Sequence, residues 1–172
     1  MKGKKNKLYN MAFPIWLLWL IPNTWLIILP VNFFIDLLVV VLTMKYLKIK
    51  NIKSFVKPTI LRIWIFGFIA DMIGTVLMII PCLIQLDYNS KIGMWWYNNL
   101  ANAIMYNPFE SPYAFIWVTV SLITTAYCIY YFNFKFCLKK VDLSLIQKNK
   151  IALSLAVFTA PYAFYFPTAM FF

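Results

Sequence analysis

Histidine is absent from the 172-residue chain, and only five side chains are acidic. Without histidine, the chain lacks the commonest general base and the commonest metal ligand of proteins. The four glycines exclude a glycine-rich phosphate loop. The three cysteines, Cys82, Cys128 and Cys137, form no C-x-x-C pair, so we expect three small apolar residues and no redox or zinc site. These absences predict a protein without a metal, a cofactor or an enzymatic activity.

Charged residues are also scarce. The chain is 63% apolar and 12% charged, whereas a soluble domain is close to half apolar and a quarter charged. Sixteen Lys and Arg residues give a net charge of +11, which in a soluble protein would suggest nucleic acid. Here the basic residues form short clusters between apolar runs, as in the loops of membrane proteins. The composition therefore predicts the lipid bilayer as a partner, and not nucleic acid.

The apolar runs predict an all-α fold, a polytopic membrane helix bundle that forms one transmembrane domain over 1–172. A helix needs about 20 apolar residues to cross a bilayer. Four segments meet this requirement, namely 24–44, 63–85, 113–134 and 151–172. The segment 11–21 is too short to span easily, and Pro22-Asn23 after it is a turn signal. We expect 11–21 to be a re-entrant, interfacial or fifth hydrophobic helix. Pro161 is expected to kink the last span.

The charges of the connecting segments predict the topology. Segments 45–62 and 135–150 are strongly basic and should be cytoplasmic, while 86–112 should be an external loop with a short helix on the membrane surface. Four spans alone would leave the lysines of the N-terminus outside. If 11–21 enters the membrane, all basic clusters become cytoplasmic, and we favour this version. The Lys-, Asn- and Ile-rich composition suggests an AT-rich genome, and the alternation of Trp, Pro and apolar residues is similar to that of many bacterial membrane proteins, so we expect a bacterial plasma membrane.

Two of the five acids lie inside predicted spans. Asp36 precedes Lys45 by nine residues and Asp71 follows Arg62 by nine, so each is about 13 Å from the cytoplasmic end of its helix. Asn32 lies one turn before Asp36, on the same face. An acid at the centre of a membrane helix costs roughly 2.5–3.5 kcal/mol. No basic residue lies within these spans to offset that cost, so at least one acid should be protonated unless a cation or water neutralises it.

Small residues accompany the second acid. Gly67, Asp71 and Gly74 share one helix face, and Ala70 forms a small-xxx-small pair with Gly74. This pattern predicts a face that packs against another helix. The two acids then have three interpretations: a proton or cation pathway, hydrogen bonding between helices, or contact with a partner protein or a lipid.

The first functional hypothesis is a small non-enzymatic membrane protein that acts by association, with a membrane protein partner, within a larger complex or as a homo-oligomer. The alternative is a transporter or channel component coupled to H⁺ or Na⁺ through Asp36 and Asp71. Hydrolysis by paired aspartates is disfavoured, because Leu37 and Met72 follow the acids where aspartyl membrane proteases carry further motif residues such as glycine.

Overall fold

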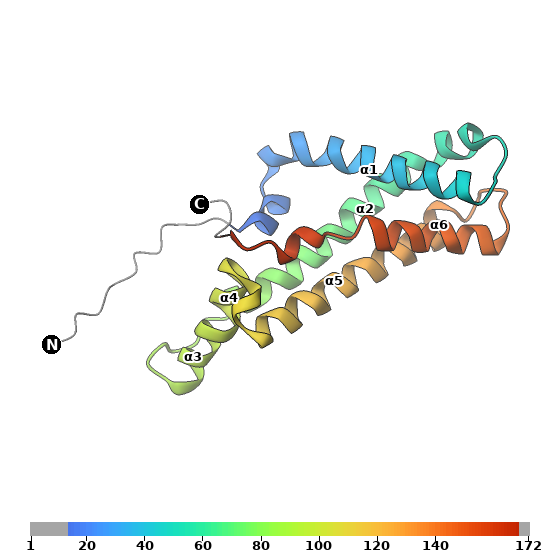
Figure 1. The fold of residues 1–172 in the computed structure, drawn as a ribbon. Helices are drawn as coiled ribbons and strands as arrows, with labels where there is room; N and C mark the ends of the chain where they lie inside the picture. Colours follow the sequence, from blue (N-terminus) through green and yellow to red (C-terminus); the bar gives the residue numbers. More distant parts are fainter. Residues whose placement is uncertain (1–13, 169–172) are drawn as a thin grey trace.

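The computed structural model describes residues 14–168, which form helices and turns and no strand. Four longer helices make an elongated bundle (Figure 1). Helix α1 packs against α2 and α6, and α5 packs against the same two helices, so the four close a ring. They are α1 (Trp25–Tyr46), α2 (Ile52–Leu83), α5 (Pro112–Phe132) and α6 (Leu145–Phe158). The predicted all-α bundle is confirmed for the described residues.

Three segments of the described chain are long and apolar enough to cross a membrane, namely Pro22–Tyr46, Ile52–Leu83 and Pro112–Cys137. The first and third agree closely with the predicted spans 24–44 and 113–134. The second begins eleven residues before the predicted 63–85, because most of the basic segment 45–62 is helical. Only residues 47–51 separate α1 from α2, with Lys48 and Asn51 in the left-handed conformation.

The fourth predicted span, 151–172, is not confirmed as a continuous helix. Helix α6 covers Leu145–Phe158, only 14 residues, and a short 3-10 turn, η6 (Tyr162–Tyr165), follows it. Pro161 lies between them, and proline cannot donate the backbone hydrogen bond that would continue α6. We expected a kink at this proline, but the helix ends there. Residues 169–172 of the predicted span lie outside the described residues.

Helix α1 exposes large apolar side chains and buries an acid, unlike the helices of soluble proteins. Its buried side chains are Asp36, Val40 and Met44, whereas Leu26 is 83% exposed and Phe34 is 66% exposed. Large apolar side chains also face outward on α2 and α5. Such surfaces are costly in water and favourable in lipid. The surface of the bundle and the apolar composition of its long helices therefore both support a membrane protein.

Two apolar clusters lie along the bundle. One contains Val40, Ile63 and Ala70, at the end with the two basic loops. The other contains Trp16, Met78 and Phe164, toward the opposite end. On α2, Asp71 and Thr75 lie between Ala70 and Met78 and are also buried. The polar residues are thus flanked by apolar packing on both sides.

The described part of segment 11–21 packs into the bundle. It forms a 3-10 helix, η1 (Ile15–Leu20), followed by a second turn, η2 (Pro22–Thr24). Trp16 is 1% exposed, and its indole N–H donates to the Ile104 carbonyl at 3.2 Å. Trp16 is therefore enclosed by protein, which disfavours a segment that lies flat at the membrane interface. Residues 11–13 lie outside the described residues.

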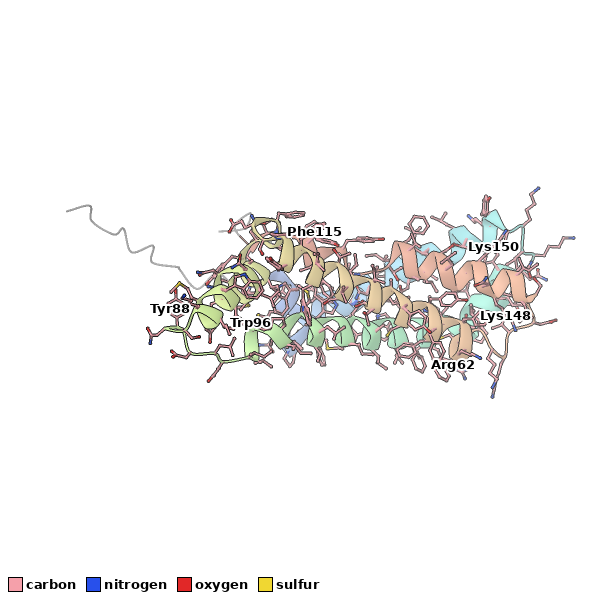
Figure 2. All side chains as sticks on the ribbon, turned by 90° about the horizontal axis from the view of Figure 1, so that it is seen from below. Arg62, Tyr88, Trp96, Phe115, Lys148 and Lys150 are labelled. Atoms are coloured by element: carbon pink, nitrogen blue, oxygen red, sulfur yellow. The ribbon has the colours of Figure 1, made fainter. Side chains whose placement is uncertain are left out.

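Segment 86–112 forms a helical cap on the end of α2 and α5. It contains α3 (Lys91–Trp96), a π-helical turn, η3 (Tyr97–Ala101), α4 (Asn102–Tyr106) and a 3-10 turn, η4 (Pro108–Glu110). The Trp96 indole donates to the Pro81 carbonyl at 3.0 Å. Tyr88 and Trp96 lie at one end of the bundle, and Lys148 and Lys150 lie at the other (Figure 2). The basic segments 45–62 and 135–150 therefore lie at one end of the bundle, and the segment 86–112 lies at the other (Figure 1).

Candidate functional site

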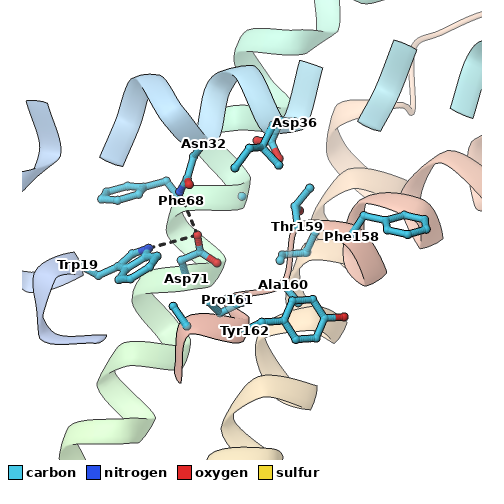
Figure 3. Close-up of a pocket in the computed structure, with 14 residues that line it drawn as sticks. Trp19, Asn32, Asp36, Phe68, Asp71, Phe158, Thr159, Ala160, Pro161 and Tyr162 are labelled. Carbon is cyan, nitrogen blue, oxygen red and sulfur yellow. Dashed lines mark hydrogen bonds between the residues drawn. The ribbon is translucent and has the colours of Figure 1, made fainter. Parts of the chain in front are cut away.

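Asp36 from α1 and Asp71 from α2 line the same cavity (Figure 3). Each side chain is 5% exposed. The cavity has a volume of about 180 Å³ and is bounded by α1, α2, the N-terminal turn and the break after α6. A liquid water molecule occupies about 30 Å³, so the space holds a few waters or a small solvated ion. The structure thus brings together the two acids that the sequence singled out.

Asp71 is incompletely satisfied. Its Oδ2 atom accepts hydrogen bonds from Trp19 Nε1 and from Asn32 Nδ2, both at 3.4 Å. Its Oδ1 atom is buried and has no hydrogen-bond partner. Both bonds exceed the usual 2.7–3.2 Å, and an unmade bond to a buried carboxylate is costly. Asp71 therefore has an open coordination position for a donor or a cation.

Asp36 lies about one turn closer to the basic end than Asp71. A Cβ atom placed on Gly67 would be 3.4 Å from Asp36 Oδ2, so Asp36 lies at the level of Gly67. Asn32, one turn before Asp36 on α1, reaches Asp71. The predicted equal depth thus holds to within one turn of helix. The absence of a side chain at Gly67 lets the carboxylate of Asp36 approach α2 closely.

The end of α6 supplies the third wall of the cavity. Thr159 lies against Asp36 (Figure 3), and its hydroxyl donates to the Leu155 carbonyl at 2.8 Å. The chain then leaves helical geometry at Ala160 and Pro161, which also line the cavity. The last carbonyls of a helix have no partners within the helix and carry the negative end of its dipole. This end of α6 therefore favours positive charge.

The small-residue face of α2 packs inside the chain. Ala70 is fully buried, and Gly67 faces Asp36 of α1. A Cβ atom on Gly74 would overlap the hydroxyl of Thr125 on α5 and come within 3.0 Å of the Phe164 ring. The predicted close packing at Gly67, Ala70 and Gly74 is therefore made by α1, α5 and η6.

Two parts of the site were missed by reasoning from sequence. Trp19 lies in the segment 11–21, which carried no predicted link to the acids, yet it donates to Asp71. Thr159 carried no signal of its own, because a hydroxyl in an apolar run most often bonds to its own helix. The nearest usable signal was Pro161, whose effect on α6 brings residues 159–161 beside the acids.

A multidentate metal site has no support among the described residues. They contain no group of three or more His, Cys, Asp or Glu side chains. Cys82, Cys128 and Cys137 are free thiols on separate parts of the bundle. Any cation in the cavity would therefore be held by two carboxylates together with amide, hydroxyl and backbone oxygens.

Comparison with known proteins assigns no family: no protein-family model, curated protein or solved structure matches the chain. The site must be interpreted from its own chemistry.

Proposed function

We propose that the chain is a multi-pass membrane protein that binds a proton or a small monovalent cation between Asp36 and Asp71, as a component of a transporter or channel. The observation that carries the proposal is the free Oδ1 atom of Asp71, buried beside a cavity that also contains Asp36. Holding two acids near the middle of a bilayer is unfavourable unless they are neutralised. A bound proton or cation would neutralise them.

The interrupted chain around the cavity adds support. Secondary transporters commonly bind ions where helices are broken near the bilayer midplane, with unwound carbonyls and helix C-termini as ligands. Here the turns η1 and η2 precede α1, and α6 ends at Phe158 beside the acids. Irregular backbone within a membrane is tolerated where protein covers it or water reaches it. The buried Trp16 and the polar cavity meet these two conditions.

The proposed location is the cell membrane, with a bacterial plasma membrane as the setting and the basic loops on the cytoplasmic side. The segments 45–62 and 135–150 contribute this orientation through the positive-inside rule. The cap over 86–112 would then lie outside, where its Trp and Tyr side chains suit the headgroup region.

Action by association with a membrane partner or a second copy is the weaker proposal on this geometry. Its support was the scarcity of polar groups within the spans and the absence of a catalytic constellation in the sequence. It allowed the small-residue face of α2 to pack either within the chain, as this face does against neighbouring segments, or against a partner. The proposal of a cation site rests instead on Asp71 Oδ1, a buried atom without a hydrogen-bond partner.

A flux measurement tests the proposal. The full chain would be reconstituted in liposomes that contain a pH-sensitive dye, and H⁺, Na⁺ and K⁺ gradients would be applied in turn. A protonophore would be added with the Na⁺ and K⁺ gradients, so that compensating H⁺ movement reports cation flux. We expect flux above that of empty liposomes for one of these ions, and its loss in Asp71→Asn. Glu110→Gln is the matched control, because Glu110 is an exposed acid in the cap. Equal flux through wild type and Asp71→Asn would refute a role for this site.

A further inference from the structure

A second pocket lies at the basic end of the bundle, away from the acids. It has a volume of about 390 Å³ and lies between the first turns of α2 and the segment that follows α5. Its charged lining residues are Arg62, Lys140 and Asp142, which gives a net charge of +1 (two cations minus one carboxylate). Ser54 contributes a hydroxyl, and Phe55 and Val141 contribute apolar surface. A site with this lining suits an anion that carries an apolar part.

The cations of this pocket are unneutralised within the chain. No carboxylate forms an ion pair with Arg62 or Lys140 in the part of the chain that the structure describes. Both side chains are exposed. Further lysines, Lys53, Lys57 and Lys139, lie on the same two segments, so the surrounding potential is positive as well. An anion entering the pocket would therefore displace no ion pair.

The depth of the pocket matches the level of lipid headgroups. Pro81 follows Arg62 by nineteen positions along α2, a rise of about 28 Å. This rise is close to the roughly 30 Å hydrocarbon thickness of a bilayer. Asp71 is the single charged residue between them. At the Pro81 level, the Trp96 indole bonds to the helix end, and tryptophan favours the membrane–water boundary. When Pro81 lies at one boundary, Arg62 lies at the other.

We infer that this pocket binds the headgroup of an anionic glycerophospholipid. The phosphodiester would lie between Arg62 and Lys140, because a guanidinium can donate two parallel hydrogen bonds to phosphate and lysine supplies a point charge. The lipid glycerol and upper acyl chain would contact Phe55 and Val141. One surplus cation matches the single negative charge of phosphatidylglycerol better than a zwitterionic headgroup. This inference is independent of the cation site at Asp36 and Asp71.

Native mass spectrometry of the full chain released from detergent tests the inference. Phosphatidylglycerol, phosphatidylethanolamine and inorganic phosphate are titrated separately. We expect one saturable phosphatidylglycerol, with weaker phosphatidylethanolamine binding and no competition by phosphate. Arg62→Gln/Lys140→Gln removes both charged hydrogen-bond donors from the phosphate, so it should weaken binding by roughly 100-fold. Asp142→Asn should strengthen it.

Lys50→Gln/Lys53→Gln is the matched control, since it removes the same charge from the same end outside the pocket. Equal weakening by both double variants would show diffuse attraction and overturn the site. Displacement of the lipid by inorganic phosphate would assign the pocket to soluble anions and also overturn the inference. Melting curves without lipid should be unchanged in both double variants, because all four side chains are exposed.

Discussion

Asp71 shows how one residue depends on three separate segments of the chain. Its two hydrogen-bond donors come from Trp19 in η1 and Asn32 in α1, while the remaining oxygen is buried without a partner. Neutral donors at 3.4 Å compensate only part of the cost of a buried carboxylate. The carboxylate of Asp71 is therefore only partly compensated by the described residues, which is the basis of the proposal that it binds a proton or a cation.

Gly74 has a different role, which is purely steric. A methyl group at this position would meet Thr125 and the Phe164 ring, whereas at Gly67 it would meet only Asp36 Oδ2, at an ordinary contact distance of 3.4 Å. We predict that Gly74→Ala destabilises the protein by about 1–3 kcal/mol through overpacking. Gly67→Ala should be neutral or stabilising, since alanine favours helix by about 1 kcal/mol. Denaturation in detergent would measure both changes.

The double variant Gly74→Ala/Thr125→Ala separates a steric effect from a general one. It removes the hydroxyl that the new methyl group would meet, so part of the lost stability should return. No recovery would argue that Gly74 is needed for a reason other than its contact with Thr125.

At the scale of the element, α6 is a short helix with a strong start and an abrupt end. Ser144 and Gln147 form a capping box, in which the Ser144 hydroxyl accepts from the Gln147 N–H at 3.2 Å and the Gln147 side chain accepts from the Ser144 N–H at 3.1 Å. At the other end, Pro161 follows Ala160 and the helix is not resumed. A helix of 14 residues rises about 21 Å, too little to cross a bilayer alone.

Loss of this cap should be measurable. We predict that Ser144→Ala lowers the free energy of unfolding by about 1 kcal/mol, because it removes the acceptor for a backbone N–H at the helix start. Ser144→Asp keeps an acceptor and should stay close to wild type. Thermal melting in detergent would compare the three proteins. Equal melting of the alanine and aspartate variants would show that the cap contributes nothing to stability.

The positions of α1 and α5 could be predicted because long apolar runs bounded by turn signals or charge have few alternative structures. The start of α2 could not, since the basic residues of 45–62 indicated a loop. Pro58 instead lies inside α2 as its seventh residue, where it has no N–H to donate to the Ser54 carbonyl. The site was predicted in part. Asn32 and Asp36 share a face of α1 by helical spacing, and Asp71 was predicted at a similar depth on α2. Trp19 and Thr159 reach these residues through tertiary packing, which local patterns do not encode.

For the whole molecule, the two ends differ in chemistry. The end with the short loops carries lysines and the pocket at Arg62, and the other end carries the aromatic cap. Between them, α2 runs about 28 Å from Arg62 to Pro81. This asymmetry is the basis of the proposed orientation across the bilayer.

Cysteine labelling in cells tests the orientation. In a background with the three native cysteines replaced, we predict that Asn89→Cys in the cap reacts with a membrane-impermeant thiol reagent added outside. Lys50→Cys in the first basic loop should react only after the membrane is permeabilised, because the positive-inside rule places this loop in the cytoplasm. The opposite pattern would invert the proposed topology.

The most direct test of the central claim is a set of melting curves for wild type, Asp36→Asn, Asp71→Asn and the double variant, recorded across pH and with Na⁺, K⁺ or neither. A proton or cation that binds the folded state selectively raises its stability. We predict that wild type responds to pH or to one cation, and that the asparagine variants lose this response while remaining at least as stable without ions. Glu110→Gln should respond as wild type does. If each asparagine variant is instead destabilised and no ion or pH change affects wild type, Asp36 and Asp71 serve only to hold the helices together.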